Sequence, residues 1–505
     1  MKLKQIKQIL IKTTMKTSRR TFLKSAGTLT VGVVISPSII SCNKSKNEDV
    51  KFLNTLNEVR KSRKQHFNMC GYAAPPMETV RIGFIGLGNR GPSSLRRLCL
   101  IDGVEIKAIC DVRPESLAKG RKILADTGLP PADEYGKTED DWKNMCDRND
   151  IDLIYQVTPW RLHTPVSVYA MEHDKHAAVE MPAALTIEDC WKLVETSERT
   201  KKHCMMLENC CYDFFEMQVL NMARQGVFGE IIHAEAAYIH DQLGIAFGKS
   251  YPEMWLLKES QTRNGNHYPT HGLGPVCQVM NINRGDRMTK LVSMQSNDFT
   301  YGPEAHRLAQ QDDFYKEFDT DSYRGNMNTS IIKTEKGRTI MLQHDVSSPR
   351  PYSRIYMVSG TKAVAQKWPL PPRISLGNHE WLSEAEMKEL EEKYTPPIVK
   401  KVGDLAKKVG GHGGMDFMMD WRLIDCLRNG LPLDQNVYDA ALWSSMVALT
   451  EWSVANDSEP IEVPDFTCGA YKANQPIDIS MGKGGNTGVR LESIKTDESV
   501  KQQNV

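Results

Sequence analysis

The chain has 505 residues, with 64 Lys and Arg against 63 Asp and Glu, so its formal net charge is +1. Nucleic-acid-binding domains usually carry a clear basic excess or stripe, and this balance argues against such a partner. Hydrophobic residues make up 40% and charged residues 25%, which excludes a disordered chain and is typical of a globular protein. The 12 cysteines form no C-x-x-C pair, which argues against zinc ribbons and redox dithiols.

Residues 1–42 indicate an export signal. A basic segment holds the twin arginine Arg19 and Arg20, and an apolar run follows from Ala26 to Ile40. A helix of that length rises about 1.5 Å per residue and falls short of the ~30 Å of hydrocarbon in a bilayer. A charged start, a short apolar centre and small residues near the end are typical of a signal peptide. Cys42 follows Ile-Ile-Ser, which resembles the box in which a lipoprotein cysteine is lipidated after cleavage.

We therefore expect an exported protein that is periplasmic or is held at a membrane only through lipid on Cys42. The alternative is an ordinary signal in which this cysteine occurs by chance, and Met15 is an alternative start to Met1. The twin-arginine signal resembles those of the export route that carries folded proteins, typically proteins that hold a cofactor loaded in the cytoplasm. The signal therefore predicts a cofactor site in the mature chain.

The next segments predict a tether and a first domain. Residues 43–79 are polar and charged, and we expect a tether with a short helix over 51–65. Strands and helices then alternate over 80–209, which predicts a doubly wound parallel sheet of the Rossmann type. The strands are expected at 81–86, 104–110 and 151–157, and the helices at about 91–101 and 114–126.

The pattern changes after residue 210 to longer amphipathic strands, which predicts an open-faced α+β substrate domain over 210–470. We expect a mixed or antiparallel sheet with strands at 231–239, 329–333, 339–345 and 354–359. Residues 365–410 are rich in Pro, Lys and Glu and predict a surface excursion. Helices at about 415–429 and 436–455 end the domain, and 471–505 is expected to be a tail.

A glycine motif follows the first strand and opens a helix. Gly86, Gly88 and Gly91 fit G-x-G-x-x-G, in which the glycines permit a tight turn, close approach of a pyrophosphate and close helix packing. The helix N-terminus adds amide donors and a partial positive charge. Asp111 ends the next strand, where its carboxylate can accept both ribose hydroxyls and repel a 2′-phosphate. The motif in this context predicts an NAD site and favours NAD over NADP.

Later segments fit the same site. Residues 158–163, Thr-Pro-Trp-Arg-Leu-His, follow a strand at the edge where ligands bind, and Glu180-Met181-Pro182 and Glu208-Asn209 end two more strands. These positions resemble the Gfo/Idh/MocA oxidoreductase superfamily, a Rossmann domain followed by an open-faced α+β domain. In its ordinary dehydrogenases a lysine that assists proton removal precedes the proline. Met181 occupies that position here and cannot transfer a proton, which counts against a plain sugar dehydrogenase.

Tyr268 and His271 are the candidate catalytic residues. They are three residues apart and share a face if a helix begins there. Histidine titrates near neutral pH, and a neighbouring cation would lower the pKa of the tyrosine, so the two can form an acid/base pair; the alternative is a buried polar pair in a core. Tyr238 and Tyr352 can each stack on a sugar ring or be core or surface residues. His412, between two pairs of glycines, is a hinge or site-edge candidate.

Together these motifs resemble glycoside hydrolase family 109, which contains NAD-dependent α-N-acetylgalactosaminidases, over about residues 78–470. The motifs are Gly86–Gly91, Trp160–His163, Glu180–Ala183, Glu208–Tyr212, Ala237–Asp241 and Tyr268–Pro275. The resemblance implies NAD contacts at Asn89, Arg90, Asp111, Trp160, Arg161, Leu162, His163, Glu180, Met181 and Asn209. It implies sugar contacts at Tyr238, Tyr268, His271 and Tyr352.

Two positions depart from the family pattern. The family usually has valine at the position of Met181, which is a mild change because both side chains are apolar. An arginine commonly follows the tryptophan that corresponds to Trp255, but this chain has Leu256. The loss of that cation bears on the substrate preference and on activity.

The resemblance also implies a mechanism that needs NAD. The sequence offers no carboxylate pair of the kind that most glycosidases use. The expected route is oxidation of the sugar at C3, elimination across C1–C2, addition of water and re-reduction, with retention at the anomeric carbon. The expected substrate is a glycan with terminal N-acetylgalactosamine, α-linked in preference. The sequence leaves the oligomeric state open, a homo-oligomer included.

Two alternatives remain at this stage. One is a redox-neutral, NAD(P)-dependent sugar oxidoreductase of the Gfo/Idh/MocA type, against which Met181 argues. The other is a non-catalytic sugar-binding lipoprotein that retains NAD as a structural element. Tyr268 and His271 argue against this second reading, whereas Leu256 favours it.

Overall fold

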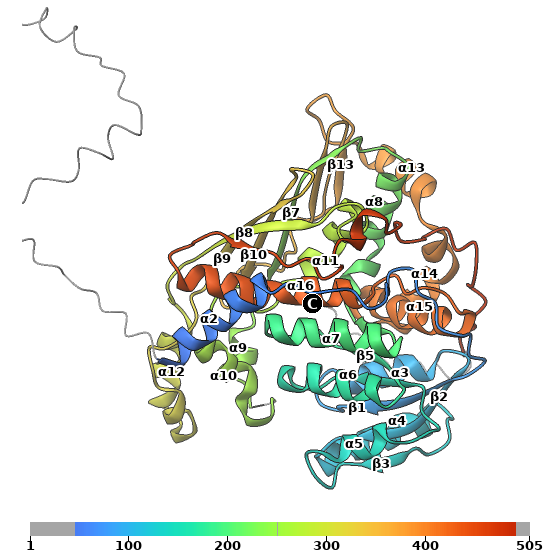
Figure 1. The fold of residues 1–505 in the computed structure, drawn as a ribbon, viewed down its shortest axis with the longest axis vertical. Coiled ribbons are helices and arrows are strands. Elements are labelled where there is room, and N and C mark those ends of the chain that lie inside the picture. Colours follow the sequence, from blue (N-terminus) through green and yellow to red (C-terminus); the bar gives the residue numbers. More distant parts are fainter. Residues whose placement is uncertain (1–45, 250, 491–505) are drawn as a thin grey trace, which may run out of the picture. The chain divides into compact units, whose positions relative to one another are not determined.

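Two β-sheets organise the chain in the computed structural model, which describes residues 46–249 and 251–490 (Figure 1). The predicted signal, with Arg19, Arg20 and Cys42, lies outside the described residues. None of the helices that the structure describes combines the length and the apolar character that a membrane crossing requires.

The first sheet has six parallel strands in the order β3-β2-β1-β4-β5-β6. These strands are β1 Val80–Ile85, β2 Val104–Cys110, β3 Asp133–Tyr135, β4 Leu153–Gln156, β5 His176–Val179 and β6 Cys204–Met206. The chain order reverses between β1 and β4, and ligands bind at such a switch point, beyond the carboxyl ends of the strands. The predicted Rossmann fold class is confirmed.

Helices cover this sheet, which explains why its central strands are almost continuously buried. They are α3 Gly91–Cys99, α4 Pro114–Asp126, α5 Asp141–Cys146, α6 His163–Glu172 and α7 Ile187–Thr200. The amino end of α3 follows directly on the glycine motif, so its free N–H groups face the switch point.

The second sheet is mixed, with strand order β13-β12-β11-β7-β10-β9-β8-β14. Its strands are β7 Ile231–Ile239, β8 Met288–Gln295, β9 Asn328–Thr334, β10 Thr339–Asp345, β11 Met357–Gly360, β12 Val364–Gln366, β13 Arg373–Ser375 and β14 Ile461–Glu462. Strands β7 and β10 pair in parallel, and the other pairs are antiparallel. Buried and exposed residues alternate along β9 and β10, as expected of a sheet with one packed face.

Helix α16, Val437–Ala455, joins the two sheets. It packs on β8 of the second sheet and on α7 and β6 of the first, and Figure 1 shows it between them. Helix α15, Met415–Asn429, packs along α3 and reaches β1. The remaining α-helices among the described residues are α2 Lys46–Arg60, α8 Phe214–Arg224, α9 Leu243–Ala246, α10 Trp255–Thr262, α11 Thr270–Met280, α12 Tyr301–Ala309, α13 Glu384–Tyr394 and α14 Pro397–Val409.

Two segments expected to project from the body pack against it instead. In the expected tether, Met69 and Ala74 are buried, and Lys51 forms an ion pair with Glu451 of α16. In the expected tail, the carboxylate of Asp425 accepts hydrogen bonds from the backbone of Gly485 at 2.8 Å and from the hydroxyl of Thr487 at 2.9 Å. Composition alone gave no sign of these contacts, because polar segments can be fixed by hydrogen bonds and ion pairs.

A close backbone contact fixes the start of α11 against β7. A Cβ atom on Gly272 would lie 2.4 Å from the backbone nitrogen and 2.6 Å from the oxygen of Ala237. Only glycine permits this approach, and it brings His271, the preceding residue, beside Tyr238. The packing of two backbones therefore sets the geometry of the predicted substrate side.

We expect Gly272→Ala to lower the melting temperature, because the added methyl group must push α11 away from β7. Overpacking of this kind costs about 1–3 kcal/mol. Gly244→Ala is the matched control, since a Cβ atom there has no neighbour within 4 Å. Thermal unfolding of the two variants measures the difference, and equal melting temperatures would contradict the close contact.

Candidate active site

A cavity of about 320 Å³ opens at the switch point of the first sheet. Loops after β1, β2, β4 and β5 form one side, and residues of the second domain form the other. Its lining includes the predicted residues Gly86, Gly88, Asn89, Arg90, Asp111, Trp160, Arg161, Leu162, His163, Glu180, Met181, Tyr238 and Tyr268. Gly91, Asn209, His271 and Tyr352 are the predicted residues, among those described, that do not line it.

The three glycines of the motif have the roles expected of a dinucleotide site. A Cβ atom on Gly86 would lie 2.2 Å from the carbonyl oxygen of Val157, and one on Gly91 would lie 2.0 Å from that of Gly86. A Cβ atom on Gly88 would meet only the guanidinium of Arg113, at 3.2 Å. The backbone at Gly88 is therefore open to a pyrophosphate, while the other two glycines close the turn and the helix contact.

Asp111 is buried at the end of β2 and holds the glycine loop. Its Oδ2 accepts a hydrogen bond from the backbone of Leu87 at 2.8 Å, and its Oδ1 accepts one from the backbone of Arg113 at 3.0 Å. The guanidinium of Arg113 also contacts Asp111 and lines the cavity. We did not foresee this cation, although it follows Asp111 by two residues, and it weakens the expected repulsion of a 2′-phosphate.

The segments after β4 and β5 are tied together by His163. Both ring nitrogens lie close to carbonyl oxygens, Nδ1 at 2.7 Å from Pro182 and Nε2 at 2.8 Å from Thr158. Trp160 forms an aromatic contact with Trp255, with ring centroids 5.2 Å apart, across the cavity wall. The ring of His163 therefore fixes the two loops that face a bound cofactor.

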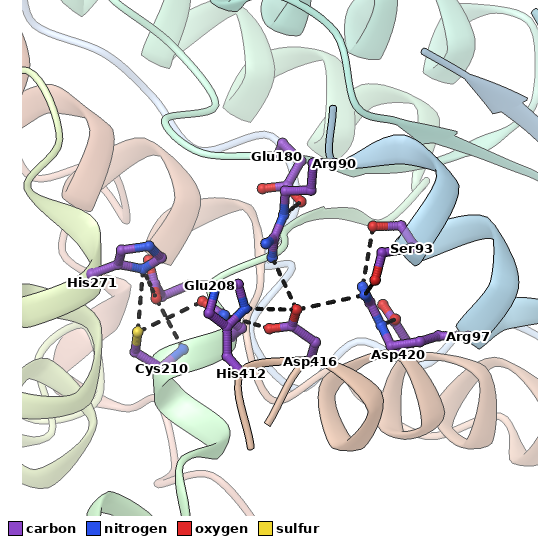
Figure 2. Close-up of polar contacts among 12 residues, drawn as sticks. Arg90, Ser93, Arg97, Glu180, Glu208, Cys210, His271, His412, Asp416 and Asp420 are labelled. Carbon is purple, nitrogen blue, oxygen red and sulfur yellow. Dashed lines mark hydrogen bonds and ion pairs between the residues drawn. The ribbon is translucent and has the colours of Figure 1, made fainter. Parts of the chain in front are cut away.

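Arg90 joins three parts of the chain beneath the cavity (Figure 2). It forms an ion pair with Glu180 after β5 and lies 3.5 Å from the carboxylate of Asp416 on α15. Asp416 also contacts His412 at 2.9 Å and accepts a hydrogen bond from Asn209. Asn209 is buried, and its amide nitrogen donates to this carboxylate, so it supports the site through α15; its contact with NAD stays a prediction.

Four predicted substrate residues form one aromatic cluster. The ring centroids of Tyr238 and Tyr268 are 5.0 Å apart, and the ring of His271 lies 5.1 Å from Tyr238 and 5.0 Å from Tyr268. The ring of Tyr352 lies 6.1 Å from that of Tyr238. His271 belongs to the first turn of α11, whereas Tyr268 precedes the helix. Tyr238 and Tyr268 therefore line the cavity, and His271 and Tyr352 pack against them outside the cavity wall.

The prediction that a neighbouring cation lowers the pKa of Tyr268 is wrong. Burial raises the pKa of Tyr268 well above its ordinary value, and the neighbouring Tyr238 and Glu180 raise it further. Arg90 lowers the pKa of Tyr268, but its effect is smaller than the combined effect of burial and the two neighbours. Tyr268 therefore keeps its hydroxyl proton at neutral pH and is a hydrogen-bond donor rather than a base.

Polar residues behind the cluster were not among the predicted site residues. Nδ1 of His271 lies 2.8 Å from Oε1 of Glu208 and 3.2 Å from the sulfur of Cys210. Asp416 was also not among the predicted site residues. The sequence indicates it only by its position four residues after His412, at the start of a helix. The open backbone at Gly88, the carboxylate after β2 and the cavity at the switch point together fit NAD.

Two consecutive parts of the chain match two family models. Residues 80–208 match "Oxidoreductase family, NAD-binding Rossmann fold", and residues 212–473 match "Glycosyl hydrolase 109, C-terminal domain". With the fold and the cavity, they define an NAD-binding glycoside hydrolase.

Curated relatives are similar in sequence to this protein over most of the chain. A glycosyl hydrolase family 109 protein of Porphyromonas gingivalis is 50% identical over 412 residues, which are 79% of this chain and 86% of the relative. A protein of Bacteroides fragilis named alpha-N-acetylgalactosaminidase is 50% identical over 417 residues, or 80% of this chain and 96% of the relative. The chain belongs to glycosyl hydrolase family 109.

Solved structures support the fold. A scyllo-inositol dehydrogenase from Lactobacillus casei, with NAD(H) and scyllo-inositol bound, matches 76% of this chain and 99% of its own, with a TM-score of 0.54 and 15% identity. An aldose–aldose oxidoreductase from Caulobacter crescentus matches the same shares with a TM-score of 0.53 and 15% identity. At this identity the likeness concerns the fold alone.

We expect Asp111→Ala to weaken NAD binding, because it removes the ribose acceptor and frees the backbone of Leu87. A hydrogen bond to a charged group is worth about 1.5–3 kcal/mol, which corresponds to roughly a 10–150-fold rise in Kd. Glu115→Ala, on the exposed first turn of α4, is the control. Calorimetric titration of NAD into protein stripped of nucleotide measures both, and an unchanged Kd for Asp111→Ala would contradict this role.

Proposed function

We propose that this glycosidase removes terminal N-acetylgalactosamine from glycans, with α linkages preferred. The cluster of Tyr238, Tyr268 and His271 beside the dinucleotide cavity is the observation that carries the proposal. Aromatic rings suit the apolar faces of a sugar, and the hydroxyl of Tyr268 can donate to a sugar oxygen. The relative named alpha-N-acetylgalactosaminidase supports the choice of sugar.

The proposed reaction uses a redox cycle instead of a carboxylate pair. NAD, when bound, supplies oxidation of the sugar at C3 and the matching re-reduction. A ketone at C3 acidifies the proton at C2, so a modest base suffices to remove it. The two predicted carboxylates of the cavity are both engaged, Glu180 by Arg90 and Asp111 by two backbone N–H groups. Glu139 and Glu253 also line the cavity, so the support for the redox route comes from the dinucleotide site itself.

The proton at C2 passes to His271 in this proposal. Tyr268 retains its own proton, so of the two predicted catalytic residues the imidazole is the acceptor. The C2–H electrons form the C1–C2 double bond, the bond from C1 to the glycosidic oxygen breaks, and that oxygen takes a proton from solvent. Water then adds at C1 and releases one proton to solvent, and the imidazolium returns a proton to C2.

Leu256 gives the cavity an apolar wall beside Trp255. We propose that this wall receives the acetamido methyl group of the sugar, since an uncharged side chain offers no ion pair to an anionic substituent. The departure from the family's arginine therefore favours a neutral N-acetylated sugar over an acidic one.

Export and lipidation complete the proposal. The twin arginine, the short apolar run and Cys42 support an exported lipoprotein, held at a membrane through lipid on that cysteine. A cofactor that is oxidised and reduced within each turnover needs no external pool, which suits a protein that leaves the cytoplasm already folded.

Purified protein should hydrolyse the α-linked nitrophenyl N-acetylgalactosaminide faster than the β-linked one. In heavy water the released sugar should carry deuterium at C2, because the proton leaves and returns through an exchangeable imidazole. His271→Ala should lower turnover by ~10²–10⁴-fold while retaining NAD. Mass spectrometry and NMR of the product provide the measurement, and hydrolysis that leaves C2 fully protonated would contradict the elimination route.

Cys42→Ala should move the protein from the membrane fraction to the soluble fraction, because lipid on this residue is the proposed anchor. Fractionation followed by detection of the protein measures the change. Cys70→Ala, downstream of the signal, is the matched control and should leave the distribution unchanged. Membrane association that survives Cys42→Ala would show that the cysteine occurs by chance.

A further inference from the structure

His271 has two neighbours on the same ring nitrogen. Oε1 of Glu208 lies 2.8 Å from Nδ1 and the sulfur of Cys210 lies 3.2 Å from it, as Figure 2 shows. Glu208 is completely buried and Cys210 nearly so, whereas the side chain of His271 is 12% exposed. The contacts set which ring nitrogen carries the proton, and hence which one can act as a base.

Glu208 is an ionised acceptor at this position. Burial raises the pKa of Glu208, whereas the hydrogen bonds that its Oε1 accepts from Nδ1 of His271 and from the backbone N–H of Cys210 lower it and favour the ionised carboxylate. An ionised carboxylate has no proton to donate, so the hydrogen in the 2.8 Å contact belongs to Nδ1 of His271. Since Nδ1 then carries the hydrogen, Cys210 cannot donate to it.

The other ring nitrogen is free. Among the residues that the structure describes, none forms a hydrogen bond with Nε2 of His271, and the ring contacts Tyr238 and Tyr268 of the cavity wall. A neutral imidazole that donates through Nδ1 presents an unshared electron pair at Nε2. Nε2 is therefore the ring nitrogen that is available to a substrate, and the carboxylate of Glu208 occupies the Nδ1 side of the ring.

The position of Glu208 is itself fixed by packing. Its backbone nitrogen donates to Met206 at 2.9 Å, and its carbonyl oxygen accepts from the side chain of Gln435 at 2.8 Å. A Cβ atom on Gly274 of α11 would lie 2.9 Å from Cγ of Glu208, so this glycine leaves the room that the side chain occupies. The backbone of Glu208 is therefore held between β6 and the segment before α16, and α11 leaves room for its side chain.

We infer that Glu208 is a positioning residue that holds His271 as the Nδ1–H tautomer and leaves Nε2 as the acceptor of the sugar C2 proton. This inference rests on the proposed function for the identity of that proton. When the proton arrives, both ring nitrogens carry hydrogen, and the negative charge of Glu208 balances the positive charge of the ring. The proton is later returned to C2, and Glu208 takes up none itself.

Glu208→Gln tests the assignment with little change in shape. The glutamine amide can donate to Nδ1, which favours the tautomer with hydrogen on Nε2 and so blocks the base. We expect kcat to fall ~10²–10⁴-fold, with little change in KM or in bound NAD. Cys210→Ala removes the other neighbour of Nδ1 and should keep kcat near the wild-type value. Full activity in Glu208→Gln, or its loss only in Cys210→Ala, would overturn the assignment.

The tautomer can be observed without activity. In long-range nitrogen–proton NMR spectra of protein labelled with ¹⁵N-histidine, the signals of His271 are identified by their absence in His271→Ala. We expect Nδ1–H in the wild type and a shift towards Nε2–H in Glu208→Gln. Nε2–H in the wild type would overturn the inference even if Glu208→Gln failed to fold. Wild-type protein that shows Nδ1–H but cleaves no sugar would instead contradict the proposed function alone.

A metal ion is the competing occupant of this cluster. Ligand atoms of Glu208, Cys210 and His271 all lie within 4.8 Å of one another, a spacing that a zinc ion could use. A metal bound at Nδ1 would replace the proton that the inference requires. One equivalent of zinc in the purified active enzyme, with activity lost on chelation, would therefore overturn the role of Glu208, and active enzyme without metal supports it.

Discussion

The contact between α3 and α15 through buried charges supports both the cofactor loop and the substrate side. Arg90 and Arg97, on the glycine loop and its helix, face Asp416 and Asp420, one turn apart on α15. Arg97 lies 2.7 Å from Asp420, which also accepts from the hydroxyl of Tyr155 on β4. Taking such charges out of water is costly, and removing one partner of a buried pair costs about 3–5 kcal/mol. The C-terminal part of the chain is therefore needed to hold the loop that receives NAD.

The same arrangement explains how an oxidoreductase fold can serve a hydrolase. The Rossmann domain supplies the glycine loop and Asp111, and the second domain supplies Tyr238 and Tyr268 to the same cavity, with His271 packed against these two rings. Met181 occupies the position where ordinary dehydrogenases of the superfamily have a lysine, and it is buried. In the proposed mechanism the proton-transferring group lies instead on α11, whose start is fixed by the close contact of Gly272 with β7.

Local patterns predicted much of the fold. The expected ranges 231–239, 339–345 and 415–429 agree with β7, β10 and α15, because apolar periodicity and turn residues mark their ends. The sequence also predicted the glycine motif and Asp111, because their spacing along the chain is local. It did not predict contacts between residues that are far apart in the sequence. Asn209 and Asp416 are 207 residues apart, and the shift in the pKa of Tyr268 depends on burial that a sequence does not display.

The central claim is that the glycosidic bond breaks only after oxidation at C3, and a pair of deoxy substrates tests it most directly. The 3-deoxy and 4-deoxy forms of the α-linked nitrophenyl N-acetylgalactosaminide each lack one hydroxyl, so a loss of binding affects both, whereas only the first is unable to form the ketone. We predict that the NAD-loaded enzyme cleaves the 4-deoxy substrate and leaves the 3-deoxy substrate intact at saturating concentration. Cleavage of the 3-deoxy substrate at a rate similar to that of the parent compound would remove the redox step from the mechanism.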